Sequence, residues 1–372
     1  MLIRIHLEGR PGERRVAVAP REARRLVEMG NRILVPAGAG AGAAFPDADY
    51  VAAGAEVFAG APPRAELLLG VGPLTAADVA GVEAAAGFFD PLGDPAGMAA
   101  VAATGVTALA MELVPRTTLA QSMDALSSQA TVAGYQAVLL AASVLPRMFP
   151  MLMTAAGTIR PARVLVLGAG VAGLQAIATA RRLGAVVSGY DIRPAAREQV
   201  ESLGARFVGG PVEAAAEGQG GYASEVDDAT RSAQQEALAA AVAESDVVIT
   251  TAQVPGRRAP LLVTAAMVEA MRPGAVVVDL AASTGGNCEA TIADEAVSVG
   301  MVTVLGPTDL ASGAAGDASE MYGRNLVALL DHLITDGALV IDPEDEIAAA
   351  VCVTRDGSVQ DPRVLAALEG AR

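Results

Sequence analysis

The feature that most constrains the fold is a strand–turn–helix–strand pattern between Arg163 and Asp191. The apolar run at 163–167 predicts a buried strand, the sequence GAGVAG at 168–173 interrupts it, and residues 174–183 predict a helix. A second apolar run, at 186–190, ends at Asp191. A glycine-rich turn between strand and helix, with an acidic residue ending the next strand, is the pattern of a dinucleotide-binding βαβ unit.

Each part of this turn has a chemical reason. Gly168 permits the tight turn, Gly170 lets the backbone approach a pyrophosphate, and Gly173 lets the helix pack against the strand. We expect the phosphates to lie against the backbone N–H groups that begin the helix, around Val171 and Ala172, where the helix dipole is positive.

The acidic residue at the end of the second strand indicates the cofactor. A carboxylate at Asp191 accepts hydrogen bonds from the adenosine ribose hydroxyls and repels a 2′-phosphate, which favours NAD(H) over NADP(H). Arg193, two residues on, would weaken this preference. The alternative is a glycine-rich turn in an α/β core that holds no ligand. The full strand–turn–helix–strand context favours the nucleotide site.

Predicted strands and helices alternate along the chain, so we expect an α/β fold with parallel, doubly wound sheets. A length of 372 residues suits two domains. We expect two Rossmann-like domains with a cleft between them. The first domain, Rossmann-like and flavodoxin-like, takes residues 1–126 and 314–372. The NAD(H)-binding Rossmann domain takes residues 127–313. Within the first domain, the apolar run at 16–19 predicts a short strand.

Composition excludes several functions. The chain contains no lysine, which removes Schiff-base chemistry and any lysine acid, base or clamp. A net charge of −16 argues against a nucleic-acid partner, because nothing supplies a basic stripe. The two cysteines form no motif and no metal site is predicted. No apolar stretch reaches the roughly 18–20 residues of a membrane-spanning helix, and no signal peptide is evident, so we expect a soluble cytoplasmic chain.

A second polar constellation precedes the fingerprint. It consists of Arg116, Gln121, Asp124 and Ser127, followed by Thr-Val-Ala-Gly-Tyr at 131–135. This segment resembles a signature of proton-translocating nicotinamide nucleotide transhydrogenases, in their soluble NAD(H)-binding component, domain I. Further similar segments lie at 171–180, 197–204, 220–225, 249–256, 279–288 and 352–357, and together they cover the chain almost from end to end.

The resemblance implies that Arg116, Gln121, Asp124 and Ser127 form a loop at the nicotinamide. Gln121 would position the ring and bridge toward a second nucleotide, while the other three would orient the carboxamide of NAD and one another. Read from the residues alone, Asp124 and Ser127 stand at helical spacing and also fit a helix N-terminal cap followed by exposed polar residues.

The resemblance also implies further contacts with the nucleotide. Gly221 and Tyr222 would belong to a mobile loop that folds over the bound nucleotide, and Gln234, Ala252 and Leu280 fall at nucleotide-contact positions of the family. The alternative for Tyr222 is a flexible surface loop that carries an incidental aromatic side chain.

The wider group includes alanine dehydrogenase, which is an alternative function because it shares the opening motif at 13–20. Those enzymes carry a lysine and a histidine that bind and protonate the keto acid. The corresponding positions here, 71–73 and 88–90, contain neither, and an amino-acid dehydrogenase needs such a proton carrier. We expect the two histidines, His6 and His332, to be structural. An NAD-binding regulatory or scaffold protein is a further alternative, but it would have no reason to keep the 116–127 constellation.

The function implied by the resemblance is that of a Re/Si-specific, proton-translocating NAD(P)+ transhydrogenase, active only with partner subunits. Hydride would pass directly from NADH on this chain to NADP+ on a partner, without an acid or base. The implied partners are a second copy of the chain in a homodimer, a membrane subunit and an NADP(H)-binding beta subunit. Because the sequence stops at Arg372 without an apolar span, we expect a peripheral subunit held on the inner face of the plasma membrane through these partners.

Overall fold

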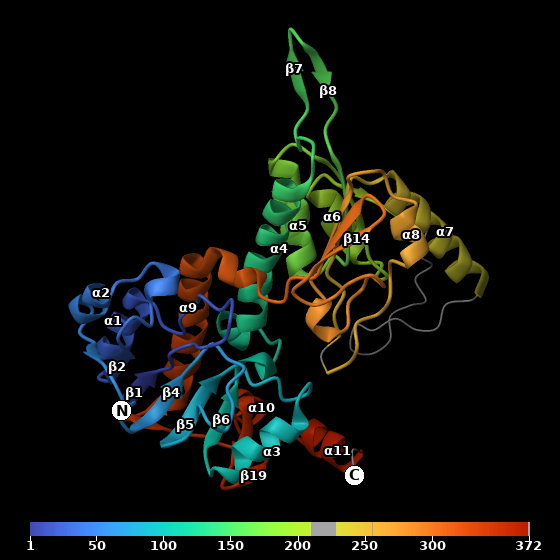
Figure 1. The fold of residues 1–372 in the computed structure, drawn as a ribbon. Coiled ribbons are helices and arrows are strands. Elements are labelled where there is room, and N and C mark those ends of the chain that lie inside the picture. Colours follow the sequence, from blue (N-terminus) through green and yellow to red (C-terminus); the bar gives the residue numbers. More distant parts are fainter. Residues whose placement is uncertain (210–227, 255, 371–372) are drawn as a thin grey trace. The chain divides into compact units, whose positions relative to one another are not determined.

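The structure, a computed structural model, describes residues 1–209, 228–254 and 256–370, with side chains omitted at 228–234. The chain divides into two compact units, one formed by residues 1–129 and 311–372 and the other by residues 130–310. Each unit is built on its own β-sheet (Figure 1). None of the described helices is both long enough and apolar enough to cross a membrane.

The first unit contains an eight-stranded sheet in the order β19-β18-β6-β5-β4-β1-β2-β3. Its strands are β1 (Leu2–Ile5), β2 (Arg32–Pro36), β3 (Glu56–Phe58), β4 (Ala65–Leu69), β5 (Val82–Gly87), β6 (Thr107–Ala110), β18 (Cys352–Arg355) and β19 (Ser358–Val359), with a separate small ribbon of β16 (Ile334–Thr335) and β17 (Ala338–Leu339). Its α-helices are α1 (Pro20–Glu28), α2 (Asp47–Ala52), α3 (Pro95–Ala103), α9 (Ala315–Leu333), α10 (Glu346–Val351) and α11 (Pro362–Gly370). Short 3-10 helices are η1 (Ala41–Ala43), η2 (Met111–Leu113), η3 (Leu119–Met123) and η5 (Leu310–Ala314). The first residue of η5, Leu310, belongs to the second unit and the others to the first.

Both faces of this sheet are buried. Alternate strand residues divide between two apolar clusters: Leu67 and Leu69 face the cluster that includes α1, α9 and α10, and Leu68 faces the cluster that includes α3 and α11. This alternation is what a period of two along each strand dictates, and the apolar residues on both faces explain why the central strands read as continuous hydrophobic runs.

The strand order corrects the flavodoxin-like part of the sequence prediction. The six parallel strands follow the Rossmann order 3-2-1-4-5-6, since β3 pairs with β2 and β4 takes the other side of β1. A flavodoxin-like order would place the third strand beside the first. The short β3 is incompletely buried and suits an edge, whereas β4, with Leu67, Leu68 and Leu69 fully buried, suits the centre.

The predicted strand at 16–19 is wrong. These residues are buried, but they form an irregular segment whose backbone bonds go to side chains: the Val16 N–H donates to Ser319 Oγ at 2.9 Å, and the Val18 carbonyl accepts from the Tyr50 hydroxyl at 2.9 Å. A buried loop satisfied in this way has the same apolar composition as a buried strand, so the sequence does not distinguish them.

The second unit contains a seven-stranded sheet in the order β11-β10-β9-β12-β13-β15-β14. Its strands are β9 (Arg163–Leu167), β10 (Val186–Tyr190), β11 (Arg206–Phe207), β12 (Val247–Thr250), β13 (Val276–Asp279), β14 (Ala296–Val299) and β15 (Val302–Leu305). All neighbouring pairs are parallel except β14 with β15. Its helices are α5 (Val171–Arg182), α6 (Ala196–Ser202), α7 (Asp228–Glu244), α8 (Ala265–Glu269) and η4 (Ala282–Thr284), and α4 (Ala125–Val144) begins in the first unit and ends in this one.

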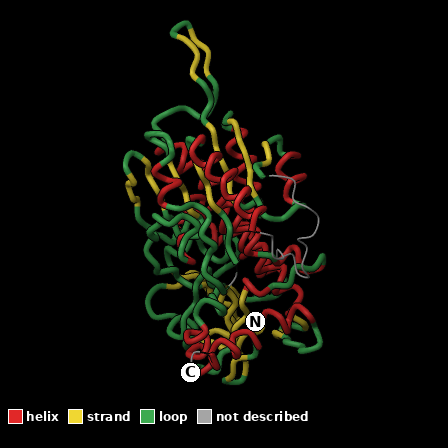
Figure 2. Tube along the Cα trace, turned by 90° about the vertical axis from the view of Figure 1, so that its right-hand side faces the viewer, coloured by secondary structure: helices red, strands yellow, loops and turns green. Residues whose placement is uncertain are grey.

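This sheet is doubly wound, as predicted. Helices α4, α5 and α6 pack on the face that carries Val164 and Val166, whereas α7 and α8 pack on the face that carries Leu165 and Leu167 (Figure 1). Outside the sheet, a hairpin of β7 (Leu152–Thr154) and β8 (Gly157–Ile159) projects away from the body of the unit in both views (Figures 1 and 2).

Candidate functional site

The glycine-rich turn lies where β9 ends and α5 begins. Gly168 has a φ of +95°, a conformation that side-chain-bearing residues rarely adopt. A Cβ on Gly173 would collide with the Gly168 carbonyl oxygen, whereas a Cβ on Gly170 would meet no protein atom within 4 Å. The turn therefore needs glycine at Gly168 and Gly173 for its own backbone, while Gly170 leaves open space beside the helix terminus.

Space at Gly170 coincides with unpaired backbone donors. Gly170 is the N-cap of α5 and has no side chain to cap the first N–H groups, and Gly170 and Val171 are both exposed. The first N–H groups of a helix lack intrahelical partners and carry the positive end of the dipole, so this terminus is suited to an anion such as a pyrophosphate.

A glycine on a neighbouring helix, whose role was not predicted from the sequence, also shapes this terminus. A Cβ on Gly134 of α4 would collide with the carbonyl oxygen of Ala172, so the backbone of α4 packs directly against the first turn of α5. An isolated glycine inside a predicted helix is the signal that indicates such a close approach.

The carboxylate of Asp191 is buried at the end of β10 and makes four short hydrogen bonds. Its Oδ2 accepts from the Ala169 N–H at 2.7 Å and from the Arg193 guanidinium at 2.8 Å; its Oδ1 accepts from the Arg193 backbone N–H at 2.8 Å and from Arg193 Nε at 3.0 Å. Burial alone would raise the pKa of Asp191, but the bonds from Arg193 and Ala169 outweigh it and hold the pKa below its usual value. Asp191 is thus ionised at neutral pH and tied to the glycine-rich turn.

A buried polar network joins the ends of β12 and β13, next to Ala252 and Leu280. The fully buried carboxylate of Asp279 accepts five hydrogen bonds of 2.7–3.0 Å, from the hydroxyls of Thr250 and Thr291 and from the backbone N–H groups of Ala281, Asn287 and Cys288.

Asn287 extends this network to the predicted contact position at Ala252. Its side-chain oxygen accepts from the Ala252 N–H at 3.0 Å, and its amide donates to the carbonyls of Ala252 and Pro260, both at 2.8 Å. Gln253 then donates to the Leu280 carbonyl at 2.8 Å, so the two predicted contact positions are linked. Asn287, whose side chain bonds to the backbone of Ala252 and Pro260, was not among the residues predicted from the sequence.

The 116–127 constellation lies in the first unit: Arg116 precedes η3, Gln121 is on η3, Asp124 lies between η3 and α4, and Ser127 is in the first turn of α4. Asp124 Oδ1 accepts from the Ser127 N–H at 2.9 Å and Oδ2 from the Ser127 hydroxyl at 2.6 Å, which is the geometry of a helix N-terminal cap. The side chains of Arg116 and Gln121 are exposed and make no hydrogen bond or ion pair with any described residue. The structure therefore brings Asp124 and Ser127 together, and a capping role explains neither Arg116 nor Gln121.

Three predicted contact residues are only partly placed or not placed. Gly221 and Tyr222 lie outside the described residues. Gln234 belongs to α7, but its side chain is also outside the described part of the chain.

The opening motif of the chain forms a closed ionic cluster. The Arg15 guanidinium is buried and donates to both carboxylate oxygens of Glu13, at 2.8 and 2.6 Å, and to Gln129 at 2.9 Å. Burial would raise the pKa of Glu13, but the bonds from Arg15 and Ser312 lower it to about 2. Arg15 is thus engaged by an ionised carboxylate of its own chain.

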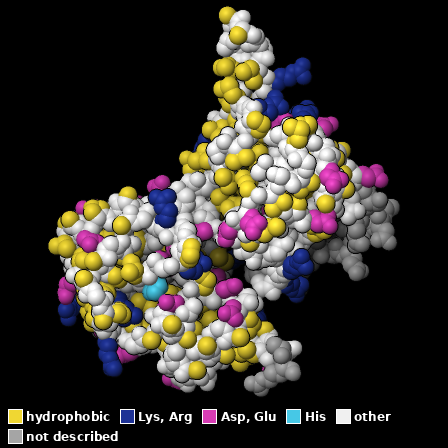
Figure 3. Space-filling model, viewed as in Figure 1, with side chains coloured by type: hydrophobic (Ala, Val, Ile, Leu, Met, Phe, Trp, Pro, Cys, Tyr) yellow, Lys and Arg dark blue, Asp and Glu magenta, His cyan; other side chains and the backbone are white. Residues whose placement is uncertain are grey.

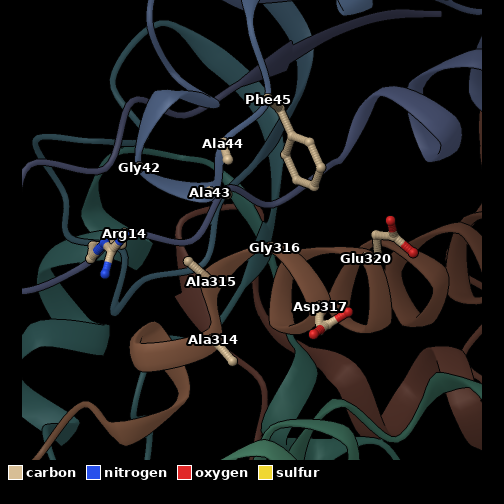
Figure 4. A pocket seen from close by; sticks show the side chains of 10 residues that line it. All are labelled: Arg14, Gly42, Ala43, Ala44, Phe45, Ala314, Ala315, Gly316, Asp317 and Glu320. Atoms are coloured by element: carbon tan, nitrogen blue, oxygen red, sulfur yellow. The ribbon is translucent and has the colours of Figure 1, made fainter.

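A shallow cavity of about 310 Å³ in the first unit contains none of the predicted site residues. It lies between the 42–45 loop and the start of α9, with Arg14 on one side and Asp317 and Glu320 on the other (Figure 4).

Comparison with known families agrees with this geometry. The model for the N-terminal domain of the alanine dehydrogenase/PNT family matches residues 4–133, and the model for its C-terminal domain matches residues 137–362. The chain belongs to the alanine dehydrogenase/PNT family.

Within the alanine dehydrogenase/PNT family, the chain is more similar in sequence to transhydrogenase subunits than to alanine dehydrogenases. It is 45% identical over 377 residues to an NAD(P) transhydrogenase alpha-subunit chain of Rhodospirillum rubrum, covering 97% of this chain and 98% of the relative. The crystal structure of a transhydrogenase from Sinorhizobium meliloti has a TM-score of 0.89 and 45% identity, covering 96% of this chain and all of the other. The alanine dehydrogenase of Mycolicibacterium smegmatis is 33% identical over 295 residues, covering 77% of this chain and 74% of the relative. The expected α/β fold with parallel sheets and two Rossmann-like domains is confirmed.

Proposed function

We propose that this chain is the NAD(H)-binding subunit of a proton-translocating NAD(P)+ transhydrogenase, in which hydride passes directly between NADH on this chain and NADP+ on a partner subunit. The observation that carries the proposal is the pair of exposed polar side chains, Gln121 and Arg116, that the fold does not use. It is supported by similarity over almost the whole chain to a transhydrogenase alpha subunit.

The second unit is suited to hold NAD(H). The first N–H groups of α5, around Val171 and Ala172, would bind the pyrophosphate across the open space at Gly170, while Gly168 and Gly173 shape the turn. Asp191 would accept bonds from the ribose hydroxyls, which favours NAD(H). The remaining proposed contacts are Arg193, Ala252, Leu280, Gln234, Gly221 and Tyr222.

The chemistry needs positioned polar groups and no proton carrier. Bound NADH supplies the hydride, so the residues have to orient two nicotinamide rings and exclude water. Gln121 is the ring-positioning residue, Arg116 orients the carboxamide, and the Asp124–Ser127 cap holds the end of the loop in place. An amino-acid dehydrogenase would instead need a proton carrier at the keto acid. The positions at 71–73 and 88–90, where those enzymes carry a lysine and a histidine, contain neither in this chain.

The partners follow from the proposed reaction. An NADP(H)-binding beta subunit would dock beside the loop that carries Gln121, and a membrane subunit would couple the transfer to proton movement. The chain would then be a cytoplasmic protein held on the inner face of the plasma membrane through these partners, Re/Si-specific, and inactive in transfer by itself.

A homodimer is supported by the projecting hairpin β7–β8. Its apolar side chains are exposed, with Met153 at 72% and Ile159 at 42%, and so is Met151 just before it, at 59% (Figure 3). A two-stranded hairpin is marginally stable in water, and an exposed apolar surface of this kind marks a protein contact. We assign this contact to the second copy of the chain.

Replacing Gln121 with alanine tests the proposed reaction. In a mixture with an NADP(H)-binding transhydrogenase domain, wild-type chain should transfer hydride from NADH to the acetylpyridine analogue of NADP+, and the Gln121→Ala variant should be slower by about 100-fold, because misplacement of the reacting rings by about 1 Å costs that much. The Kd for NADH should change less than about threefold, because Gln121 acts on transfer rather than on affinity.

The matched control is Ser122→Ala, which removes a neighbouring exposed side chain of the same 3-10 helix and should leave the rate unchanged. Unimpaired transfer by Gln121→Ala would remove Gln121 from the proposed role. Turnover of NADH with pyruvate and ammonia by the chain alone would instead establish an alanine dehydrogenase.

A further inference from the structure

The hydrogen-bond capacity of Asp191 is filled by donors of its own chain. An ionised carboxylate offers about four lone-pair positions, two on each oxygen. Oδ1 accepts from the backbone N–H and Nε of Arg193, and Oδ2 accepts from the Ala169 N–H and the Arg193 terminal nitrogen. No position is left for a ribose hydroxyl, although the Asp191 carboxylate is where the proposed function places the ribose.

Of these four donors, the guanidinium is the one able to leave. The two backbone N–H groups belong to the glycine-rich turn and to the residues that follow β10, so their positions are set by the fold. The Arg193 side chain is 47% exposed and makes no hydrogen bond or ion pair with any other described residue. Rotation of this side chain frees one position on each oxygen, which matches the two hydroxyls of a ribose.

We propose that Arg193 is a specificity-determining residue that occupies the ribose-binding oxygens of Asp191 in the free chain and is displaced when a dinucleotide binds. The inference rests on the proposed function. Because the bidentate ion pair must be lost before the ribose can bind, the apparent Kd for NADH equals the intrinsic Kd divided by the fraction of chains in which Arg193 has already turned away.

Displacement has a second consequence for the choice of nucleotide. A displaced guanidinium two residues from Asp191 remains close to the ribose, and guanidinium binds phosphate oxygens bidentately. A nucleotide with a 2′-phosphate therefore regains an ion pair with Arg193 that a nucleotide with a 2′-hydroxyl does not regain. Arg193 thus weakens NADH binding and supports NADPH binding, and both effects narrow the difference between the two Kd values.

The test is the pair of Kd values for NADH and NADPH in wild type, Arg193→Gln and Arg193→Lys, measured by calorimetry on the full chain. We expect Arg193→Gln to bind NADH roughly 3–10-fold more tightly than wild type and NADPH more weakly. The Kd for NADPH divided by the Kd for NADH should therefore rise. Arg193→Lys keeps the charge without the planar fork, and its NADH affinity should lie between those of wild type and Arg193→Gln. The matched control, Arg182→Gln, makes the same charge change at an exposed position at the other end of α5 and should bind like wild type.

Two results would overturn the inference in distinguishable ways. If wild type binds NADH and Arg193→Gln binds it equally or more weakly, Arg193 does not obstruct the ribose position, while the proposed NAD(H) site stands. If wild type itself binds no NADH, both the proposed function and the inference fail.

Discussion

Replacing Gly170 with alanine is expected to weaken NADH binding at least about tenfold while changing the free energy of unfolding by less than about 0.5 kcal/mol. The added methyl group would meet no protein atom within 4 Å, and the φ of −78° at Gly170 is open to any residue, so the fold has no reason to change. The methyl group would instead occupy the space through which a pyrophosphate reaches the first N–H groups of α5.

Gly173→Ala is the comparison that makes this result informative. Its methyl group would collide with the Gly168 carbonyl oxygen, so this variant should lose stability, by about 1–3 kcal/mol, as well as NADH binding. Calorimetric titration with NADH and urea denaturation of both variants separate the two effects. If Gly170→Ala binds NADH as wild type does, the turn is a packing feature of an α/β core and the nucleotide lies elsewhere.

The second large effect is expected at Asp279. Asp279→Ala would leave four buried donors and one half-buried donor without their acceptor; the buried ones include the Asn287 N–H and the Thr250 hydroxyl. Each unsatisfied buried donor costs about 1–3 kcal/mol, and with partial relaxation we expect the second unit to lose about 3–5 kcal/mol of unfolding free energy.

Urea denaturation, with NADH binding as a probe of the second unit, measures this loss. Glu269→Ala is the control, because it removes one carboxylate from an exposed position of α8 in the same unit and should change stability by less than about 0.5 kcal/mol. A loss below about 1 kcal/mol in Asp279→Ala would mean that the network does not hold the ends of β12 and β13 together.

The strongest sequence predictions were those in which several local signals agree. Strands β9 and β10 begin and end at the residues that the apolar runs predict, because they are bounded by glycine-rich turns and by the helix between them. The NAD(H) fingerprint also specifies where each glycine has to lie, and the structure gives a separate steric reason for Gly168 and for Gly173.

The features that could not be predicted depend on contacts between residues far apart in the chain. The buried segment at 16–19 is satisfied by Ser319 and Tyr50, which apolar composition does not reveal. The backbone of Ala252 is held by hydrogen bonds with the side chain of Asn287, which lies 35 residues away in the sequence. The Arg193 side chain is close to Asp191 in sequence, but only its rotamer shows that both carboxylate oxygens are occupied.

The roles proposed for Arg116, Gln121, Asp124 and Ser127 also depend on contacts that the sequence does not reveal. The sequence resemblance groups Arg116, Gln121, Asp124 and Ser127 as one constellation, and in the structure only Asp124 and Ser127 bond to each other. A loop that grips a bound nicotinamide is expected to complete its contacts when the nucleotide is present, since such hydrogen bonds often tighten only in the complex.

The most direct test of the central claim is to follow the transferred hydrogen itself. NADH that carries deuterium at the transferred C4 position would be mixed with this chain, an NADP(H)-binding transhydrogenase domain and NADP+ in ordinary water. Direct transfer predicts that the NADPH formed carries the deuterium without loss to solvent, and that none forms when either protein is omitted. Unlabelled NADPH with deuterium in the water, or NADPH formation by the partner domain without this chain, would contradict the account.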